Sequence, residues 1–262
     1  MSDPLRQQPP WSGQGAPAGK SRTGLVVAIA AALVLLAGGI VAVATAGRSI
    51  AGTPTAGSAS CVYSATPGDR VAKYVGLPDH AERTPASGTA QVTLTTNRGD
   101  IPVVLDRAKA PCAVQSFLFL ATKKYLDGSP CDRLTNEPNV KVLQCGDPTG
   151  TGWDGPGYQF AVERPTGLKP AGQENKLVYP AGTVAMAPAF GANGNGSQFI
   201  LVYGDTALPP TYTVLGSYQQ PGQTTLDAIA AGGVNRTVVP GTTVWTTSPR
   251  VPVTIQRAAV AG

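Results

Sequence analysis

The sequence predicts a mainly β protein: a closed barrel of short strands capped by two helices and preceded by a single transmembrane helix. Charged residues make up 13% of the chain, which contains 32 glycines and 24 prolines, whereas an average globular domain is about 25% charged. Short apolar stretches separated by Gly- and Pro-rich turns are typical of barrels and sandwiches. One long apolar segment near the N-terminus has the length of a membrane span.

The first 60 residues divide into three parts. Residues 1–23 are rich in Pro, Gly, Gln and Ser and predict a disordered tail. Residues 24–46 contain no charged residue, and such a run forms a helix of about 33 Å, enough to cross a hydrocarbon core of about 30 Å. Residues 47–60 have the small, polar composition of a linker.

Charges beside the apolar segment predict its orientation. Lys20 and Arg22 precede it and only Arg48 follows closely, so the positive-inside rule places the N-terminus in the cytoplasm and the main domain outside. A cleaved signal peptide is the alternative, because residues 44–46 have the A-x-A form of a cleavage site. The long apolar run and its extended leader favour an uncleaved membrane anchor. Both alternatives place the main domain outside the cytoplasm.

The net charge of +5 does not indicate a nucleic-acid-binding protein. Residues 1–60 hold four basic residues and one acidic residue, so most of the surplus lies beside the apolar segment. The rest of the sequence has no basic stripe interleaved with aromatic residues. A single histidine, His80, argues against most histidine-dependent catalysis and most zinc sites.

Residues 61–90 predict an irregular extension that leads into a folded domain over residues 91–262. Gln91–Leu105 alternate as two strands around a polar turn, which indicates a hairpin. Pro111 suits the first position of a helix, and apolar residues recur after it at helical spacing. Further strands are expected at Val140–Cys145, Tyr158–Val162, Thr183–Ala187, Gln198–Tyr203, Thr213–Ser217 and Arg250–Ile255, and a second helix at Thr225–Ala231.

All four cysteines follow the apolar segment and are therefore expected outside the cytoplasm, where disulfides form. They allow three connectivities. Cys131 and Cys145 lie on strands that should be hairpin neighbours, so a bond between them is one option. Cys112 is an alternative partner, and Cys61 would staple the extension to the barrel. A free, buried Cys145 is the remaining option.

Several motifs of the folded domain resemble, in order, those of the cyclophilin family. The match extends from about Val92 to Ile229, roughly half the chain, and an ordered set of motifs is far more specific than any one of them. The motifs are AP at 110–111, CDRL at 131–134, GDPTGTG at 146–152, GPGY at 155–158, GTVAMA at 182–187, GANGNGSQF at 191–199 and YTVLG at 212–216.

The resemblance is to a membrane-anchored bacterial cyclophilin, a peptidyl-prolyl cis-trans isomerase. It implies an eight-stranded antiparallel barrel capped by two helices, in agreement with the pattern of short strands. It also implies an activity that needs no metal and no cofactor, because rotation about an X-Pro bond breaks no covalent bond.

By motif position, the resemblance implies that Arg133 is the catalytic guanidinium and that Gln144 orients it and contacts the substrate backbone. Gln198 would contact the residue before proline. The apolar residues among the implied pocket residues are equally suited to a barrel core. The implied substrate-binding residues are Val142, Met186, Ala187, Gln198, Ile200, Leu208 and Tyr212.

The sequence departs from the common family pattern at four positions. Lys141 and Ile200 stand where phenylalanine is common, Ala207 where tryptophan is common, and Tyr212 where histidine is common. Fewer aromatic walls predict weaker binding of substrate and of cyclosporin. The expected partners are proline-containing segments of exported proteins, and the membrane through residues 24–46. The alternative function is a module that binds such segments at the cell surface with little turnover.

Overall fold

The computed structural model describes residues 57–189, 194–238 and 245–261. Among these residues, no helix is long and apolar enough to cross a membrane. The predicted tail, the transmembrane helix predicted at residues 24–46 and most of the predicted linker lie outside the described residues.

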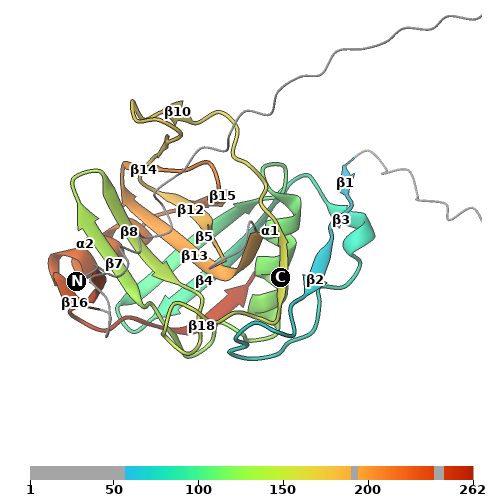
Figure 1. The fold of residues 1–262 in the computed structure, drawn as a ribbon, viewed down its shortest axis with the longest axis horizontal. Helices are drawn as coiled ribbons and strands as arrows, with labels where there is room; N and C mark the ends of the chain where they lie inside the picture. Colours follow the sequence, from blue (N-terminus) through green and yellow to red (C-terminus); the bar gives the residue numbers. More distant parts are fainter. Residues whose placement is uncertain (1–56, 190–193, 239–244, 262) are drawn as a thin grey trace, which may run out of the picture. The chain divides into compact units, whose positions relative to one another are not determined.

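One large antiparallel sheet organises the fold (Figure 1). Its eleven strands are β2 (Tyr63–Ala65), β4 (Thr89–Thr96), β5 (Gly99–Asp106), β6 (Ser129–Pro130), β7 (Arg133–Glu137), β8 (Val140–Cys145), β9 (Tyr158–Ala161), β12 (Thr183–Pro188), β13 (Gly194–Gly204), β15 (Thr213–Tyr218) and β18 (Thr254–Val260). Hydrogen-bonded neighbours follow the order β2-β9-β13-β12-β15-β5-β4-β18-β6, while β8 branches from β13 and β7 pairs with β8.

The sheet is curled but does not close, which corrects the prediction of a closed eight-stranded barrel. β6 pairs with β18 and β7 pairs with β8, but residues 131–132 between them belong to no strand. Pro130 has no N–H to continue the ladder. The N–H of Cys131 donates instead to the carbonyl of Val253, 2.9 Å away, in the segment before β18. The sheet is therefore an open half-barrel.

The predicted hairpin is confirmed as β4 and β5, paired from Thr89↔Asp106 to Thr96↔Gly99. In β5, Ile101, Val103 and Leu105 are buried and the residues between them are partly exposed. This period of two is the consequence of strand geometry, in which successive side chains point to opposite faces.

Both predicted helices form. Helix α1 (Pro111–Thr122) begins at Pro111, as expected. Its N-terminus is capped from a distant loop, because the Glu163 carboxylate accepts hydrogen bonds from the N–H groups of Cys112 (3.1 Å) and Ala113 (2.8 Å). One face of the helix is buried in the main core. On this face the Phe117 ring packs edge-on against Phe199 of β13, with ring centroids 5.1 Å apart.

Helix α2 (Gly222–Ala231) begins three residues earlier than predicted and packs against β5. The Thr225 hydroxyl donates to the carbonyl of Asp100 at 3.3 Å, and Leu226 and Ile229 are buried in the main core. The two helices thus cover parts of the same apolar interior.

Three small sheets add to the large one. β1 (Ser58–Ala59) pairs with β3 (Thr84–Pro85); β10 (Lys169–Pro170), β11 (Leu177–Tyr179) and β14 (Thr206–Leu208) form a second sheet; β16 (Val234–Val238) and β17 (Trp245–Pro249) form a hairpin. The last strand was predicted at Arg250–Ile255, but β18 begins at Thr254. Pro252 cannot donate to a ladder, so this segment connects β17 to β18 instead.

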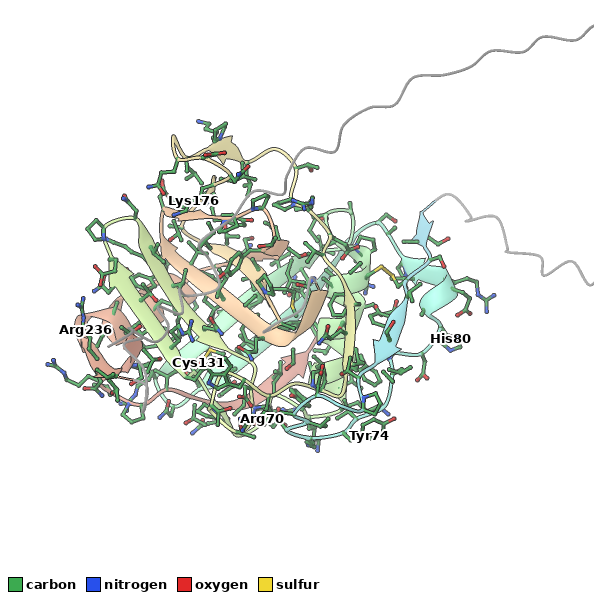
Figure 2. The ribbon with its side chains drawn as sticks, in the orientation of Figure 1. Arg70, Tyr74, His80, Cys131, Lys176 and Arg236 are labelled. Atoms are coloured by element: carbon green, nitrogen blue, oxygen red, sulfur yellow. A yellow bond between two sulfur atoms is a disulfide. The ribbon has the colours of Figure 1, made fainter. Side chains whose placement is uncertain are left out.

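The extension before β4 is not wholly irregular, because it contains β2, the short 3-10 helix η1 (Ala81–Arg83) and β3. Tyr74 and His80, labelled in Figure 2, belong to it. A disulfide between Cys61 and Cys112 joins the extension to α1. A second disulfide joins Cys131 to Cys145, so all four cysteines are paired and the option of a free Cys145 is wrong.

The Cys61–Cys112 bond should contribute strongly to stability, because it closes a loop with a sequence separation of 51. Replacing both cysteines by serine is expected to lower the free energy of unfolding by about 2–4 kcal/mol, since the reduced chain has more unfolded conformations. Urea unfolding of the full chain under non-reducing conditions measures this loss. Replacing Cys131 and Cys145 is the matched control, with a separation of 14 and an expected loss about 1 kcal/mol smaller. Equal losses, or none, would contradict the prediction.

Candidate active site

A row of directly opposed residues crosses four strands of the large sheet. Arg133 of β7 lies opposite Gln144 of β8, Gln144 lies opposite Ile200 of β13, and Ile200 lies opposite Ala185 of β12. Opposed residues of antiparallel strands direct their side chains to the same face. Arg133, Gln144 and Ile200, which lie far apart in the sequence, therefore share one face of the sheet.

Apolar residues on this face form a cluster of their own, separate from the main core. We call it the groove cluster. Its buried members are Val142, Tyr179, Ala185, Ala187, Ile200, Val202 and Leu208, and Tyr212 and Val214 pack against it partly buried. The structure thus brings together five of the predicted apolar or aromatic site residues: Val142, Ala187, Ile200, Leu208 and Tyr212.

Met186 lies on the other face of the sheet and is not part of this group. It is fully buried in the main core, because it alternates with Ala185 and Ala187, which face the groove cluster. Lys141 likewise alternates with Val142, and its side chain packs over Gly204. Lys141 therefore does not replace an aromatic wall of the groove.

The polar residues of the site are joined through the two glutamines. Gln144 Nε2 donates to Gln198 Oε1 at 2.6 Å, and Gln198 Nε2 donates to the carbonyl of Asp154 at 3.5 Å. Gln144 lies directly across the strand pair from Arg133. Arg133 Nε is buried and has no hydrogen-bond partner among the described residues. A donor left unsatisfied in this way is unusual in a folded protein.

Tyr212 lies close enough to Arg133 for the two to interact electrostatically. Burial raises the pKa of the Tyr212 hydroxyl, and the positive charge of Arg133 partly opposes that rise. Tyr212 is held by Tyr179, whose hydroxyl donates to the carbonyls of Pro209 and Tyr212, both at 3.0 Å. The two rings pack edge-on with centroids 6.3 Å apart. Tyr179 was not predicted from the sequence, because no local motif distinguishes it from an ordinary strand residue.

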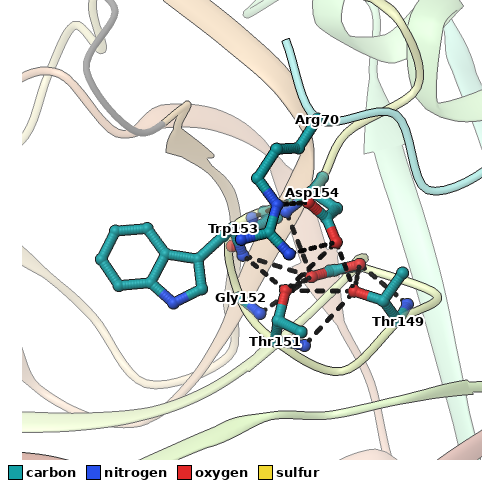
Figure 3. Close-up of polar contacts among 8 residues, drawn as sticks. Arg70, Thr149, Thr151, Gly152, Trp153 and Asp154 are labelled. Carbon is teal, nitrogen blue, oxygen red and sulfur yellow. Dashed lines mark hydrogen bonds and ion pairs between the residues drawn. The ribbon is translucent and has the colours of Figure 1, made fainter. Parts of the chain in front are cut away.

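A polar loop borders the groove, and Figure 3 shows its contacts. At its base Asp147 is fully buried. Its carboxylate accepts hydrogen bonds from the Thr149 and Thr151 hydroxyls and from four backbone N–H groups, at 2.8–3.2 Å. Burial would raise the pKa of Asp147, but these hydrogen bonds hold it below its usual value. The loop that carries the Asp154 carbonyl is thereby fixed.

The close approach of this loop to β13 requires a glycine at position 146. Gly146 has φ +107°, and a Cβ there would overlap the carbonyl oxygen of Ser197 and lie 2.9 Å from the Cα of Gln198. Glycine is the residue that tolerates both conditions. The strand that presents Gln198 can therefore lie directly against the end of β8.

Asp132 is a second unsatisfied group at the site, and sequence reasoning did not select it. Its Oδ1 is buried without a hydrogen-bond partner among the described residues. Burial raises the pKa of the Asp132 carboxyl to about 6. The negative charge of Asp147 also raises this pKa, whereas a hydrogen bond from the Asp132 backbone N–H and the positive charge of Arg133 lower it. In the folded state, the ionised form of the Asp132 carboxyl is therefore disfavoured, although Arg133 is adjacent in the chain.

The curled sheet, the two helices and the Arg–Gln–Ile groove define a mainly β, cyclophilin-like protein. The chain belongs to the family described as cyclophilin type peptidyl-prolyl cis-trans isomerase/CLD, whose sequence model matches residues 91–260. The family resemblance given by the motifs is thereby confirmed.

Mycobacterial proteins are among the similar sequences. The chain is 46% identical over 179 residues to the "Probable peptidyl-prolyl cis-trans isomerase B" of Mycobacterium tuberculosis, covering 67% of this chain and 58% of that protein. It is 45% identical over 170 residues to the protein of the same name from Mycobacterium leprae, covering 63% and 57%. The chain thus matches less than two thirds of the length of these relatives.

Solved structures show the same fold. A cyclophilin type peptidyl-prolyl cis-trans isomerase from Cryptosporidium parvum matches with a TM-score of 0.52 at 24% identity, over 67% of this chain and 99% of that one. A second structure of that protein, in the presence of the dipeptide Ala-Pro, matches with a TM-score of 0.51 at 25% identity, over 66% and 99%.

The raised pKa of Asp132 predicts that Asp132→Asn stabilises the folded protein by an amount that depends on pH. Because the folded-state pKa lies above the unfolded value of about 3.9, ionisation of Asp132 lowers stability as the pH rises through about 4 to 6. Asp132→Asn should therefore raise the free energy of unfolding by about 1–2 kcal/mol at about pH 7.5 and leave it nearly unchanged at about pH 3.5.

Urea unfolding at the two pH values measures this difference. Asp79→Asn, at an exposed position of the extension, is the control for a general effect of replacing a carboxylate by an amide. A gain from Asp132→Asn that does not depend on pH would show that the Asp132 carboxyl ionises as it does in the unfolded chain.

Proposed function

We propose that this protein is a peptidyl-prolyl cis-trans isomerase that acts on X-Pro bonds. The observation that carries the proposal is the row of Arg133, Gln144 and Ile200 on one face of the sheet, beside a buried apolar cluster. The row combines a cationic donor, a backbone-binding amide and an apolar surface, which are the groups that an X-Pro segment requires.

The reaction must lower a barrier of about 18–20 kcal/mol, which arises from resonance between the prolyl nitrogen and the preceding carbonyl. A hydrogen bond from the Arg133 guanidinium to the prolyl nitrogen would localise the lone pair of that nitrogen. Resonance is then reduced, and the twisted amide is stabilised relative to both planar forms. No bond breaks and no proton is transferred.

The remaining residues would hold the substrate. Ile200 and Leu208 would form the floor under the proline ring, with Val142 and Ala187 beside them and Tyr212 facing the ring from the edge of the groove cluster. The glutamine pair would hydrogen-bond the backbone around the proline. The Ala-Pro dipeptide present with the Cryptosporidium parvum protein supports a proline-containing ligand. An aliphatic floor offers less contact than an aromatic one, so we propose weak cyclosporin binding.

We further propose that the substrates are exported proteins and that residues 24–46 anchor the chain in a membrane, with the isomerase domain outside the cytoplasm. The two disulfides support this location, because disulfides persist mainly in oxidising compartments. Slow X-Pro isomerisation limits the folding of many proteins, so an isomerase placed there would accelerate their maturation.

Arg133→Ala tests the catalytic assignment. Loss of one preorganised transition-state donor should lower kcat/KM by about 10²–10³. Arg133→Lys should recover little, because a compact ammonium does not reproduce the planar guanidinium. NMR exchange between the cis and trans forms of an Ala-Pro peptide measures the rate.

Arg257→Ala, at an exposed position of β18, is the matched control and should retain wild-type rates, with thermal melting used to verify folding of each variant. A folded Arg133→Ala variant with full activity would show that the site is assigned wrongly. A wild-type protein that binds the peptide without accelerating exchange would instead establish the binding module.

Protease accessibility tests the proposed topology. The intact chain should sediment with membranes, and residues 61–262 should be digested by protease added outside intact spheroplasts, because Lys20 and Arg22 retain the N-terminus inside. A cytoplasmic marker protein must survive the same treatment. Release of a mature chain cleaved near Ala46 into the medium would contradict the anchor and favour the cleaved signal.

A further inference from the structure

A cavity of about 370 Å³ is lined in part by Gln198. The first part of β13 forms one wall, and the segment from Trp153 into the start of β9 forms another. The third wall is the segment Thr66–Arg70 of the extension. Gln198 also accepts a hydrogen bond from Gln144, which lies opposite Arg133, so the cavity borders the row that contains Arg133.

The wall formed by Thr66–Arg70 lies outside the part of the chain that matches the family model, which begins at residue 91. It is nevertheless firmly attached. Backbone hydrogen bonds join Thr66 N–H to Gly157 O (3.0 Å) and Gly155 N–H to Arg70 O (3.1 Å). β2, just before this wall, pairs with β9, and the Cys61–Cys112 disulfide joins the start of the extension to α1. The extension therefore gives the cavity a wall that lies outside the family match.

The charges at this wall leave one carboxylate uncompensated. The Arg70 guanidinium is paired with the nearly buried Asp154 (Figure 3). Arg70 Nε lies 2.6 Å from Asp154 Oδ1. Asp69 accepts a hydrogen bond from the neutral side chain of Gln159 at 2.8 Å, and among the described residues it forms no ion pair. The cavity rim thus carries a net negative charge, located at Asp69.

The position of the cavity determines which part of a substrate reaches it. If the backbone before the proline lies on Gln144 and Gln198, the next residue upstream lies about 3.3 Å further along an extended chain. Its side chain then enters the cavity toward Asp69. A lysine or arginine side chain is long enough to bring its charge to the rim while its methylene groups line the cavity.

We propose that the extension makes this protein selective for substrates with a basic side chain two residues before the proline, and that Asp69 is the specificity-determining residue. This inference rests on the proposed function, because it takes the X-Pro bond to lie at Arg133. The preference should be modest, about two- to fivefold, since an ion pair at an exposed carboxylate is weak.

The test compares the peptides Ac-Lys-Ala-Pro-Phe-amide and Ac-norleucine-Ala-Pro-Phe-amide, which have side chains of similar length and differ in charge. NMR exchange gives kcat/KM and titration gives Kd for each peptide with the full chain. The wild type should favour the lysine peptide about two- to fivefold. The preference should decline between about 0.01 M and 1 M salt, as the Debye length falls from about 30 Å to about 3 Å.

Asp69→Asn should reduce the lysine-to-norleucine ratio to about one, and Asp69→Lys should make the lysine peptide the poorer ligand. Asp79→Asn, which removes an exposed carboxylate elsewhere in the extension, should leave the ratio unchanged. An equal ratio in the wild type and in Asp69→Asn would overturn the inference. Absence of turnover with a lysine preference in Kd that depends on Asp69 would overturn the proposed function and leave the inference standing.

Discussion

The register between β7, β8, β13 and β12 is the constraint on which the site depends. It places Arg133, Gln144 and Ile200 directly opposite one another, and a slip of one residue would turn a strand's side chains to the other face. The main core holds this register from behind, because Leu134, Leu143 and Leu201 form a second opposed row, buried on the other face. The Cys131–Cys145 bond ties the start of β7 to the end of β8. The strand register that buries the core therefore also sets the geometry of the groove.

The buried Asp147 carboxylate connects the groove to the extension. Its hydrogen bonds fix the loop over residues 147–154, and that loop carries both the carbonyl that receives Gln198 and the carboxylate that pairs with Arg70. A buried charge is tolerated only when its partners compensate for lost hydration. Because the partners belong to one short loop, the compensation also makes the loop rigid. The groove and the extension wall are consequently positioned by a single network.

Local patterns in the sequence were sufficient to predict the β4–β5 hairpin, both helices and most strands of the large sheet. The motif positions also selected the residues that the register brings together, from Arg133 to Tyr212. Features that depend on distant contacts were not predictable. The face that Met186 occupies depends on strand pairing. The break in the ladder depends on the Val253 carbonyl, which accepts from the Cys131 N–H. The cap of α1 depends on Glu163, which lies in a remote loop. The wall at Thr66–Arg70 has no motif and depends on hydrogen bonds to residues 155–157.

If the protein is the isomerase that we propose, the unsatisfied Arg133 Nε would explain how the groove could accelerate a rotation. A buried donor without a partner costs about 1–3 kcal/mol, and Arg133 Nε is such a donor among the described residues. The nitrogen of a planar prolyl amide is a poor acceptor, because its lone pair is delocalised; in the twisted amide the lone pair is localised and accepts well. In the proposed mechanism, the donor would therefore be satisfied chiefly when the substrate is twisted. Such an interaction would favour the transition state over both ground states, which is the requirement for catalysis, whereas the proposed apolar floor would bind all three alike.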